Sequence, residues 1–357
     1  MARKRDVWNE VLSRITPPSN IAAYLEWSTG ILRINATQEA WRRLFERGGD
    51  ADLPPDEQEL LETVTHEMFH VVQIINTGYL YQLVTQLQVE IDEWLRSCNP
   101  PAEDDDVVRA FLTMPVPPEL SESVRGWIAE LDTPGAEAIT TRAIVESSAF
   151  LVQKRIFDHH FTHDAYLKTL DDSCPSPDYR HPYDVAARYL GNATVDAYPL
   201  VACLALCTLK PAEVLAPLCE EASRQQLISH SSGNTAMDID GLIGLSRHFP
   251  SFVGTAAQLS EMLPLAHPVY ARGVAVFKEL AGTNQYAQWA FMCTPHLLWA
   301  TLAEPLLRFH PLVFNDTRGR LTMIPPAAIR SQMTEQEQEQ YALRLVATAA
   351  IYARIID

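Results

Sequence analysis

The sequence HEMFH at residues 66–70 constrains this chain more than any other feature. A helix turns by about 100° and rises by about 1.5 Å per residue, so side chains four positions apart share one face. His66 and His70 would then lie about 6 Å apart, as two ligands of one metal ion require. Glu67 would lie at the flank of that face, where its carboxylate can reach a water molecule at the metal. The motif therefore predicts a metal-binding helix.

The flanking sequence favours the same helix. Pro54 and Pro55 precede Asp56 and Glu59, whose spacing is that of a capping box, so we expect the helix to begin near Asp56. An apolar stripe follows at helical spacing, formed by Leu60, Leu61, Val64, Met68, Val71, Val72 and Ile75. The histidines lie on the opposite face together with Phe69. The alternative is that this face is solvated and has no function. Phe69 on the same face favours instead a helix that forms the wall of a cleft.

A hydrolytic metal site needs a third protein ligand and an open position for water. The extended metzincin motif would place Gly at 73 and His at 76, and the chain has Gln73 and Asn76 instead. The best candidate is Glu146, in a segment that begins after Pro134-Gly135 and has helical apolar spacing from residue 138 to 157. Its carboxylate falls on the apolar side of that helix, where it is costly unless a cation meets it. A salt bridge to Arg142, one turn earlier, is the alternative.

The stretches HEMFHVVQ and AIVESSAF resemble the gluzincin type of zinc metallopeptidase, in which a glutamate from a later helix joins the two histidines of HExxH. The resemblance implies one Zn²⁺ per chain, with His66, His70 and Glu146 as ligands and Glu67 as general base. It also implies a zincin-like core and a peptide or small amide as substrate. In such a site zinc activates water, and the base accepts its proton and passes it to the leaving amine.

The oxyanion of the reaction needs a further hydrogen-bond donor, and the segment at residues 179–183 offers candidates. We expect Tyr183 to serve as this donor, with His181 as the second choice. The segment carries Pro182 and precedes an apparent helix through Ala186 and Leu190. The alternative is that the tyrosine only packs.

Two other functions stay open. In a non-haem di-iron oxygenase, carboxylates and imidazoles from several helices would bind two irons, and this chain could supply Glu62, Glu67, His70, Glu146 and the histidines at 159, 160 and 163. In a non-catalytic zincin-like binding protein, the metal shell would remain without turnover. Intact Glu67 argues against that last hypothesis, because a metal-only role needs no base there. Cys203 and Cys207 are also four apart, but their apolar surroundings predict core residues.

The expected fold class is mainly α with a small β element. Residues 24–35 predict a hairpin around Ser-Thr-Gly, residues 38–47 a helix, and residues 79–96 a helix that Gly78 separates from the motif helix. The acidic, Pro-bearing residues 99–118 predict a surface insertion. We expect a zincin-like catalytic core at residues 1–195 and a helical region packed on it at residues 196–357.

The composition of the chain excludes some classes of binding partner. The formal net charge of −17 and the lack of a basic cluster argue against nucleic-acid binding. The sequence has no apolar run of about 20 residues, so we expect no membrane span. The N-terminal residues do not have the pattern of a secretory signal. Six cysteines without regular spacing indicate reduced thiols. We therefore expect a cytoplasmic protein; the oligomeric state is not indicated.

Overall fold

The structure is a computed structural model of the whole chain. It describes residues 22–47, 53–98, 113–156, 161–231, 234–262, 270–271, 273–275, 278–279, 311–315, 321–324 and 334–356. All statements on structure below concern these residues.

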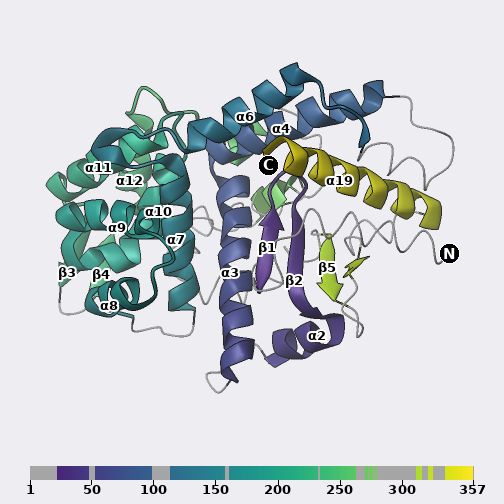
Figure 1. Cartoon of the computed structure of the whole chain (residues 1–357). Coiled ribbons are helices and arrows are strands. Elements are labelled where there is room, and N and C mark those ends of the chain that lie inside the picture. Colours follow the sequence, from purple (N-terminus) through teal and green to yellow (C-terminus); the bar gives the residue numbers. More distant parts are fainter. Residues whose placement is uncertain are drawn as a thin grey trace.

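The protein is mainly helical with a small mixed sheet (Figure 1). The α-helices are α2 (Gln38–Arg47), α3 (Pro55–Asn76), α4 (Gly78–Ser97), α6 (Pro118–Leu131), α7 (Thr141–Arg155), α8 (His163–Ser173), α9 (Pro177–Leu190), α10 (Thr194–Ala205), α11 (Pro211–Arg224), α12 (Ile239–Arg247), α13 (Ala256–Leu259) and α19 (Glu335–Ile356). Short 3-10 turns occur at η1 (Ala136–Ala138) and η2 (Gly191–Ala193). The strands are β1 (Ala23–Glu26), β2 (Ile31–Thr37), β3 (Ile228–Ser231), β4 (Asn234–Met237), β5 (Leu312–Asn315) and β6 (Leu321–Ile324).

The larger sheet has the strand order β1-β2-β5-β6. β1 and β2 form the antiparallel hairpin expected from the sequence, with Leu25 opposite Leu32. β5 pairs with β2 in parallel. β6 is the last strand of the sheet and pairs with β5 antiparallel. β3 and β4 form a separate two-stranded hairpin. β1 therefore lies at one end of the larger sheet, and that end is next to α3.

Helix α3 lies between the sheet and the helical part of the molecule (Figure 1). It packs against β1 on one side and against α7 on the other. All residues of its last two turns, from His70 to Asn76, are buried. A helix with cover on opposite sides can place polar side chains in a protected site instead of in solvent. The remaining helices extend the layer: α9 and α10 cover α7, while α6 and α19 pack on α4.

The ends of the site helices follow from local sequence. α3 begins at Pro55. Proline lacks a backbone N–H, but the N–H of the first helical residue has no partner inside the helix, so nothing is lost there. Its N-cap is Pro54 with no side-chain hydrogen bond, so the predicted capping box does not form. The helix begins one residue before the predicted start at Asp56. α7 begins after Thr140, whose hydroxyl accepts a hydrogen bond from the N–H of Ala143 at 3.0 Å.

Several predictions from the sequence are confirmed. The helix at residues 38–47 has those bounds, and α3 ends at Asn76 before α4 begins at Gly78. Cys203 and Cys207 are core residues, fully or almost fully buried. Of the predicted insertion at residues 99–118, residues 99–112 lie outside the described part of the chain.

The predicted division of the chain at residue 195 does not follow the architecture. The boundary falls inside α10. The larger sheet also combines β1 and β2 from the first part with β5 and β6 from the second. The C-terminal part thus contributes strands beside its helices, including the strand that pairs with β2. Among the described helices, none has both the length and the apolar character that a membrane span needs.

The junction of α3 and α4 predicts the first mutational outcome. A Cβ added at Gly78 would overlap the carbonyl oxygen of Gly254, which is backbone and cannot rotate away. We therefore expect Gly78→Ala to lower the free energy of unfolding by about 1–3 kcal/mol, as overpacking does. Gly126 is the control, because a Cβ there meets nothing within 4 Å inside α6. Gly126→Ala should raise stability by about 0.5–1 kcal/mol. Urea unfolding of both variants tests the pair; equal effects of the same sign would contradict this interpretation of the junction.

Candidate metal centre

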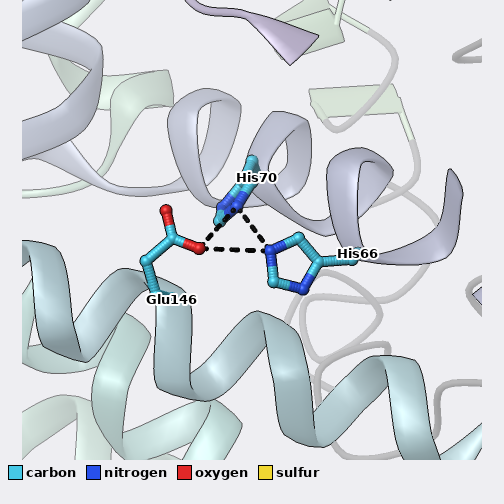
Figure 2. A group of neighbouring side chains, drawn as sticks. All are labelled: His66, His70 and Glu146. Carbon is cyan, nitrogen blue, oxygen red and sulfur yellow. Dashed lines mark hydrogen bonds and ion pairs between the residues drawn. The ribbon is translucent and has the colours of Figure 1, made fainter. Parts of the chain in front are cut away.

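The two histidines of α3 lie on one face of the helix, as their spacing predicts (Figure 2). His66 and His70 are both buried, and their Nε2 atoms are 3.0 Å apart. Their rings meet nearly edge to face, with centroids 4.6 Å apart. Two ring nitrogens this close cannot both present a bare lone pair to the other without a proton or a cation between them.

Glu146 on α7 reaches the same point from the opposite side (Figure 2). Its Oε2 atom is 3.2 Å from Nε2 of His66 and 3.5 Å from Nε2 of His70. The side chain of Glu146 retains 21% of its accessible surface, so the group can be reached from solvent at this corner. Packing of α3 against α7 thus brings together residues that are 80 positions apart.

The three ligand atoms form a compact triangle. Their separations of 3.0, 3.2 and 3.5 Å can be compared with a tetrahedral zinc site. Donors that lie about 2.0–2.1 Å from zinc at tetrahedral angles are roughly 3.3 Å apart. The triangle fits that edge length without rearrangement of either helix. His66, His70 and Glu146 could therefore hold a metal ion.

The charges in the group are strongly coupled. Burial by itself would lower the pKa of His70, but the charge of Glu146 and its hydrogen bond raise it to about 9. For Glu146, burial would raise the pKa, and the two histidines instead hold it well below its ordinary value. The carboxylate is therefore ionised, and protons compete with any metal ion for the imidazole nitrogens.

Glu67 lies beside the triangle and is not part of it. Its Oε2 atom accepts a hydrogen bond from the backbone N–H of Leu25 in β1, at 2.9 Å. Burial raises the pKa of Glu67, opposed by the charges of His70 and His66. β1 thus holds the carboxylate at the flank of the histidine face, the place that the motif predicts for a general base.

Aromatic side chains border the group on two sides. The ring of Trp27, in the turn after β1, lies against His70 with centroids 5.5 Å apart. The ring of Tyr179 on α9 stacks on His66 at 6.4 Å and 26°. The Tyr179 hydroxyl donates a hydrogen bond to Oε2 of Glu146 at 3.1 Å, the same oxygen that faces both histidines. The half-buried Tyr179 thus places a hydroxyl group directly beside the Glu146 oxygen that would bind the metal.

Tyr183 and His181, the predicted oxyanion donors, contact other residues. Tyr183 is fully buried, and its hydroxyl hydrogen-bonds with Nδ1 of His163 at 2.8 Å. Nε2 of the exposed His181 donates to the carbonyl oxygen of Glu137 at 2.6 Å. From the sequence, the Pro-bearing residues 179–183 are expected ahead of a helix, whereas α9 begins at Pro177 and includes Pro182. Tyr179 and Tyr183 are one helical turn apart, and the earlier of the two reaches the group.

The alternative partners of Glu146 and of the other carboxylates are also visible. Arg142 does not bind Glu146 but forms a two-pronged ion pair with Asp132, at 2.6 and 3.0 Å. Glu62 pairs with Lys154 of α7 at 2.6 Å and is not part of the group formed by His66, His70 and Glu146. α7 ends at Arg155 and α8 begins at His163, so His163 does not lie on the helix that carries Glu146.

The di-iron alternative needs a second group of metal ligands, and the described residues do not form one. His159 and His160 lie outside the described residues. His163 is bound to Tyr183, as given above. Within the described ranges, the triangle of His66, His70 and Glu146 is the one group of three such ligands that could hold a metal ion.

Comparison with known proteins gives no relative for this chain. No protein-family model, no curated protein and no solved structure matches it. The function must therefore be argued from the site itself.

The triangle predicts stoichiometric metal binding. We expect the wild-type protein to bind one divalent ion per chain after equilibration with zinc and dialysis, as measured by elemental analysis. His66→Ala, His70→Ala and Glu146→Ala should each lose that ion, because two ligands do not hold zinc against dialysis. His181→Ala is the control, since it removes an exposed imidazole outside the group and should keep the ion.

Thermal unfolding gives a second measure of the same binding. Zinc at about 100 times its dissociation constant should stabilise the wild type by about 2.7 kcal/mol and leave the ligand variants unchanged. Full metal content in any of the three alanine variants would contradict the assigned ligand set.

Proposed function

We propose that this protein is a zinc-dependent hydrolase that cleaves a peptide bond or another amide. The observation that carries the proposal is the convergence of His66, His70 and Glu146 on one point, with Glu67 held beside it. Two imidazoles and one glutamate are a ligand set of hydrolytic zinc, which leaves a coordination position for water or substrate. Bound there, zinc would supply Lewis acidity to a carbonyl group and acidity to a water molecule.

Glu67 would act as the general base. It adjoins the first histidine of the motif, and its backbone partner in β1 restricts its rotation. One carboxylate oxygen is occupied by the N–H of Leu25, which leaves the other oxygen to accept the proton of the attacking water. The same carboxyl group would then deliver that proton to the leaving amine. A site that only stores metal needs no such carboxylate.

Tyr179 would be the donor to the developing oxyanion. Its hydroxyl lies 3.1 Å from the ligand oxygen of Glu146, so it would be close enough to donate to a carbonyl oxygen bound beside that ligand. The partly exposed edge at Glu146 is where such a substrate can approach. We extend the resemblance to gluzincins on this basis: ligands and base come from HExxH and a later helix, while the donor comes from a third helix.

Iron is the competing metal. Two histidines and one carboxylate also form the ligand triad of non-haem iron enzymes. Glu67 favours zinc hydrolysis, since the mononuclear iron triad assigns no role to a fourth side chain at that flank. Elemental analysis of protein purified without added metal separates the two, because iron in place of zinc would contradict the proposal.

Glu67→Gln tests the proposed chemistry. We expect this variant to keep zinc and to lose about 10²- to 10⁴-fold in kcat, because the amide cannot accept the proton. The measurement is mass spectrometry of a mixed peptide and amide library after incubation with zinc-loaded protein. Glu59→Gln is the matched control on the exposed part of the same helix and should cleave as the wild type does. Wild-type protein that holds zinc and cleaves nothing would favour a binding role instead.

Tyr179→Phe tests the oxyanion donor. Loss of the hydroxyl should lower kcat by about 10²- to 10³-fold with a smaller change in KM, because the bond forms in the transition state. Tyr183→Phe is the control on the same helix, and it removes a hydroxyl that binds His163. That control should reduce stability and not kcat. Equal loss of kcat in both variants would mean that α9 matters only for packing.

A further inference from the structure

Gln73 joins the two helices that carry the metal ligands. It follows His70 by three residues on α3, so it shares the histidine face, and it is fully buried. Its Nε2 atom donates to the carbonyl oxygen of Val145 at 3.1 Å and to Oγ of Ser148 at 2.8 Å, both on α7. Its Oε1 atom lies 2.9 Å from Nδ1 of His70.

These contacts fix the orientation of the Gln73 amide. A carbonyl oxygen can only accept, so the atom that faces Val145 must be the NH₂ group. The hydroxyl of Ser148 donates to the carbonyl oxygen of Ile144, so its oxygen is free to accept from the same NH₂. The amide oxygen of Gln73 must then point at His70.

The orientation of the amide determines the tautomer of His70. An amide oxygen has no proton to give, so Nδ1 of His70 must carry the hydrogen and donate it. In a neutral imidazole with Nδ1 protonated, the lone pair lies on Nε2. Nε2 is the atom that lies 3.0 Å from His66 and 3.5 Å from Glu146, inside the ligand triangle.

We propose that Gln73 is a positioning residue of the metal site, which selects the His70 tautomer that presents Nε2 to the metal. The proposal rests on the metal site put forward above. The contacts of Gln73 with Val145 and Ser148 on α7 hold its amide in the orientation that faces His70. One buried side chain therefore orients an imidazole ligand. His66 has no equivalent partner among the described residues, since its buried Nδ1 atom makes no hydrogen bond there.

Substitutions at residue 73 separate the two links. Gln73→Met keeps the length of the side chain and removes every polar contact. We expect its zinc affinity to fall about 10- to 100-fold, the usual effect of losing the partner of a ligating histidine. Gln73→Glu keeps an acceptor for His70 and loses the donor to α7, so its affinity should stay within about threefold of the wild type. Ser148→Ala loses one contact on α7 only and should also stay within about threefold.

Gln88→Leu is the matched control for loss of a buried amide. Gln88 is almost fully buried on α4 and donates to the carbonyl oxygen of Ser28 at 2.8 Å, not to a ligand. Its zinc affinity should equal that of the wild type. Affinity is measured by competition with a chromophoric chelator, and circular dichroism of the metal-free variants checks that each is folded.

NMR of histidine-labelled, zinc-loaded protein reads the tautomer directly. The wild type should show a slowly exchanging Nδ1 proton on His70, with Nε2 as the metal-bound nitrogen. In Gln73→Glu that proton should move downfield, because its acceptor becomes charged. An unchanged Nδ1 proton in this variant would overturn the proposal even if Gln73→Met did not fold.

The affinities give the other decisive outcomes. Wild-type affinity in folded Gln73→Met would overturn the role of Gln73 and leave the hydrolase proposal intact. An equal loss in Gln73→Met and Gln73→Glu would show that the link to α7 matters and not the orientation of His70, which also overturns it. Zinc binding without amide cleavage in the wild type would end the proposed function only, whereas a wild type that binds no zinc would end both.

Discussion

The contact between α3 and α7 is the interaction on which the candidate site depends. It brings a carboxylate with two imidazoles into a space where their lone pairs face one another. Such a group is unfavourable in a protein interior unless a proton or a cation lies among the atoms. The low pKa of Glu146 and the raised pKa of His70 show how strongly the metal-free group demands positive charge. A divalent ion would meet that demand with the same geometry.

The remaining contacts of these helices hold the site from outside. Lys154 of α7 pairs with Glu62 of α3 two turns away from Glu146, which ties the helices together at a second point. On the opposite side, the edge strand β1 binds Glu67 through its backbone. The sheet therefore positions the proposed base, and the helical layer positions the third ligand. This explains why α3, which carries both histidines and the base, lies between the two layers (Figure 1).

Much of the site could be predicted from the sequence because local rules determine it. The spacing of His66 and His70 fixes their common face wherever a helix forms, and a lone carboxylate among apolar residues identified Glu146. The sequence does not single out Tyr179, because Pro182 indicates a helix that begins after it, whereas α9 begins at Pro177 and contains Pro182 in its interior. In the sequence, Gln73 is notable only because it replaces the glycine of the metzincin motif. Its two partners on α7 are 72 and 75 positions away, and no local pattern indicates them.

The fold was predictable to a similar extent and for the same reason. The hairpin of β1 and β2 and the helix at residues 38–47 follow from alternation and periodicity within a few residues. The pairing of β5 with β2 does not, because it joins strands about 280 residues apart that are each four to seven residues long. A short apolar run such as Leu312–Asn315 carries no sign of its partner. Long-range pairing of this kind depends on the whole chain.

The two histidines are held by different means, and this difference has a consequence for how the site would work. His70 is fixed through its Nδ1 atom by Gln73 and lies against Trp27. His66 has no hydrogen bond at Nδ1 within the described structure, and its ring is instead stacked on Tyr179. Tyr179 therefore contacts both His66 and Glu146, the two ligands nearest the exposed edge. Movement of this tyrosine toward a substrate would release its hydrogen bond to Glu146 while the stacked ring still restrained His66. The rigid half of the site would then be the His70 side, and the adaptable half would face the substrate.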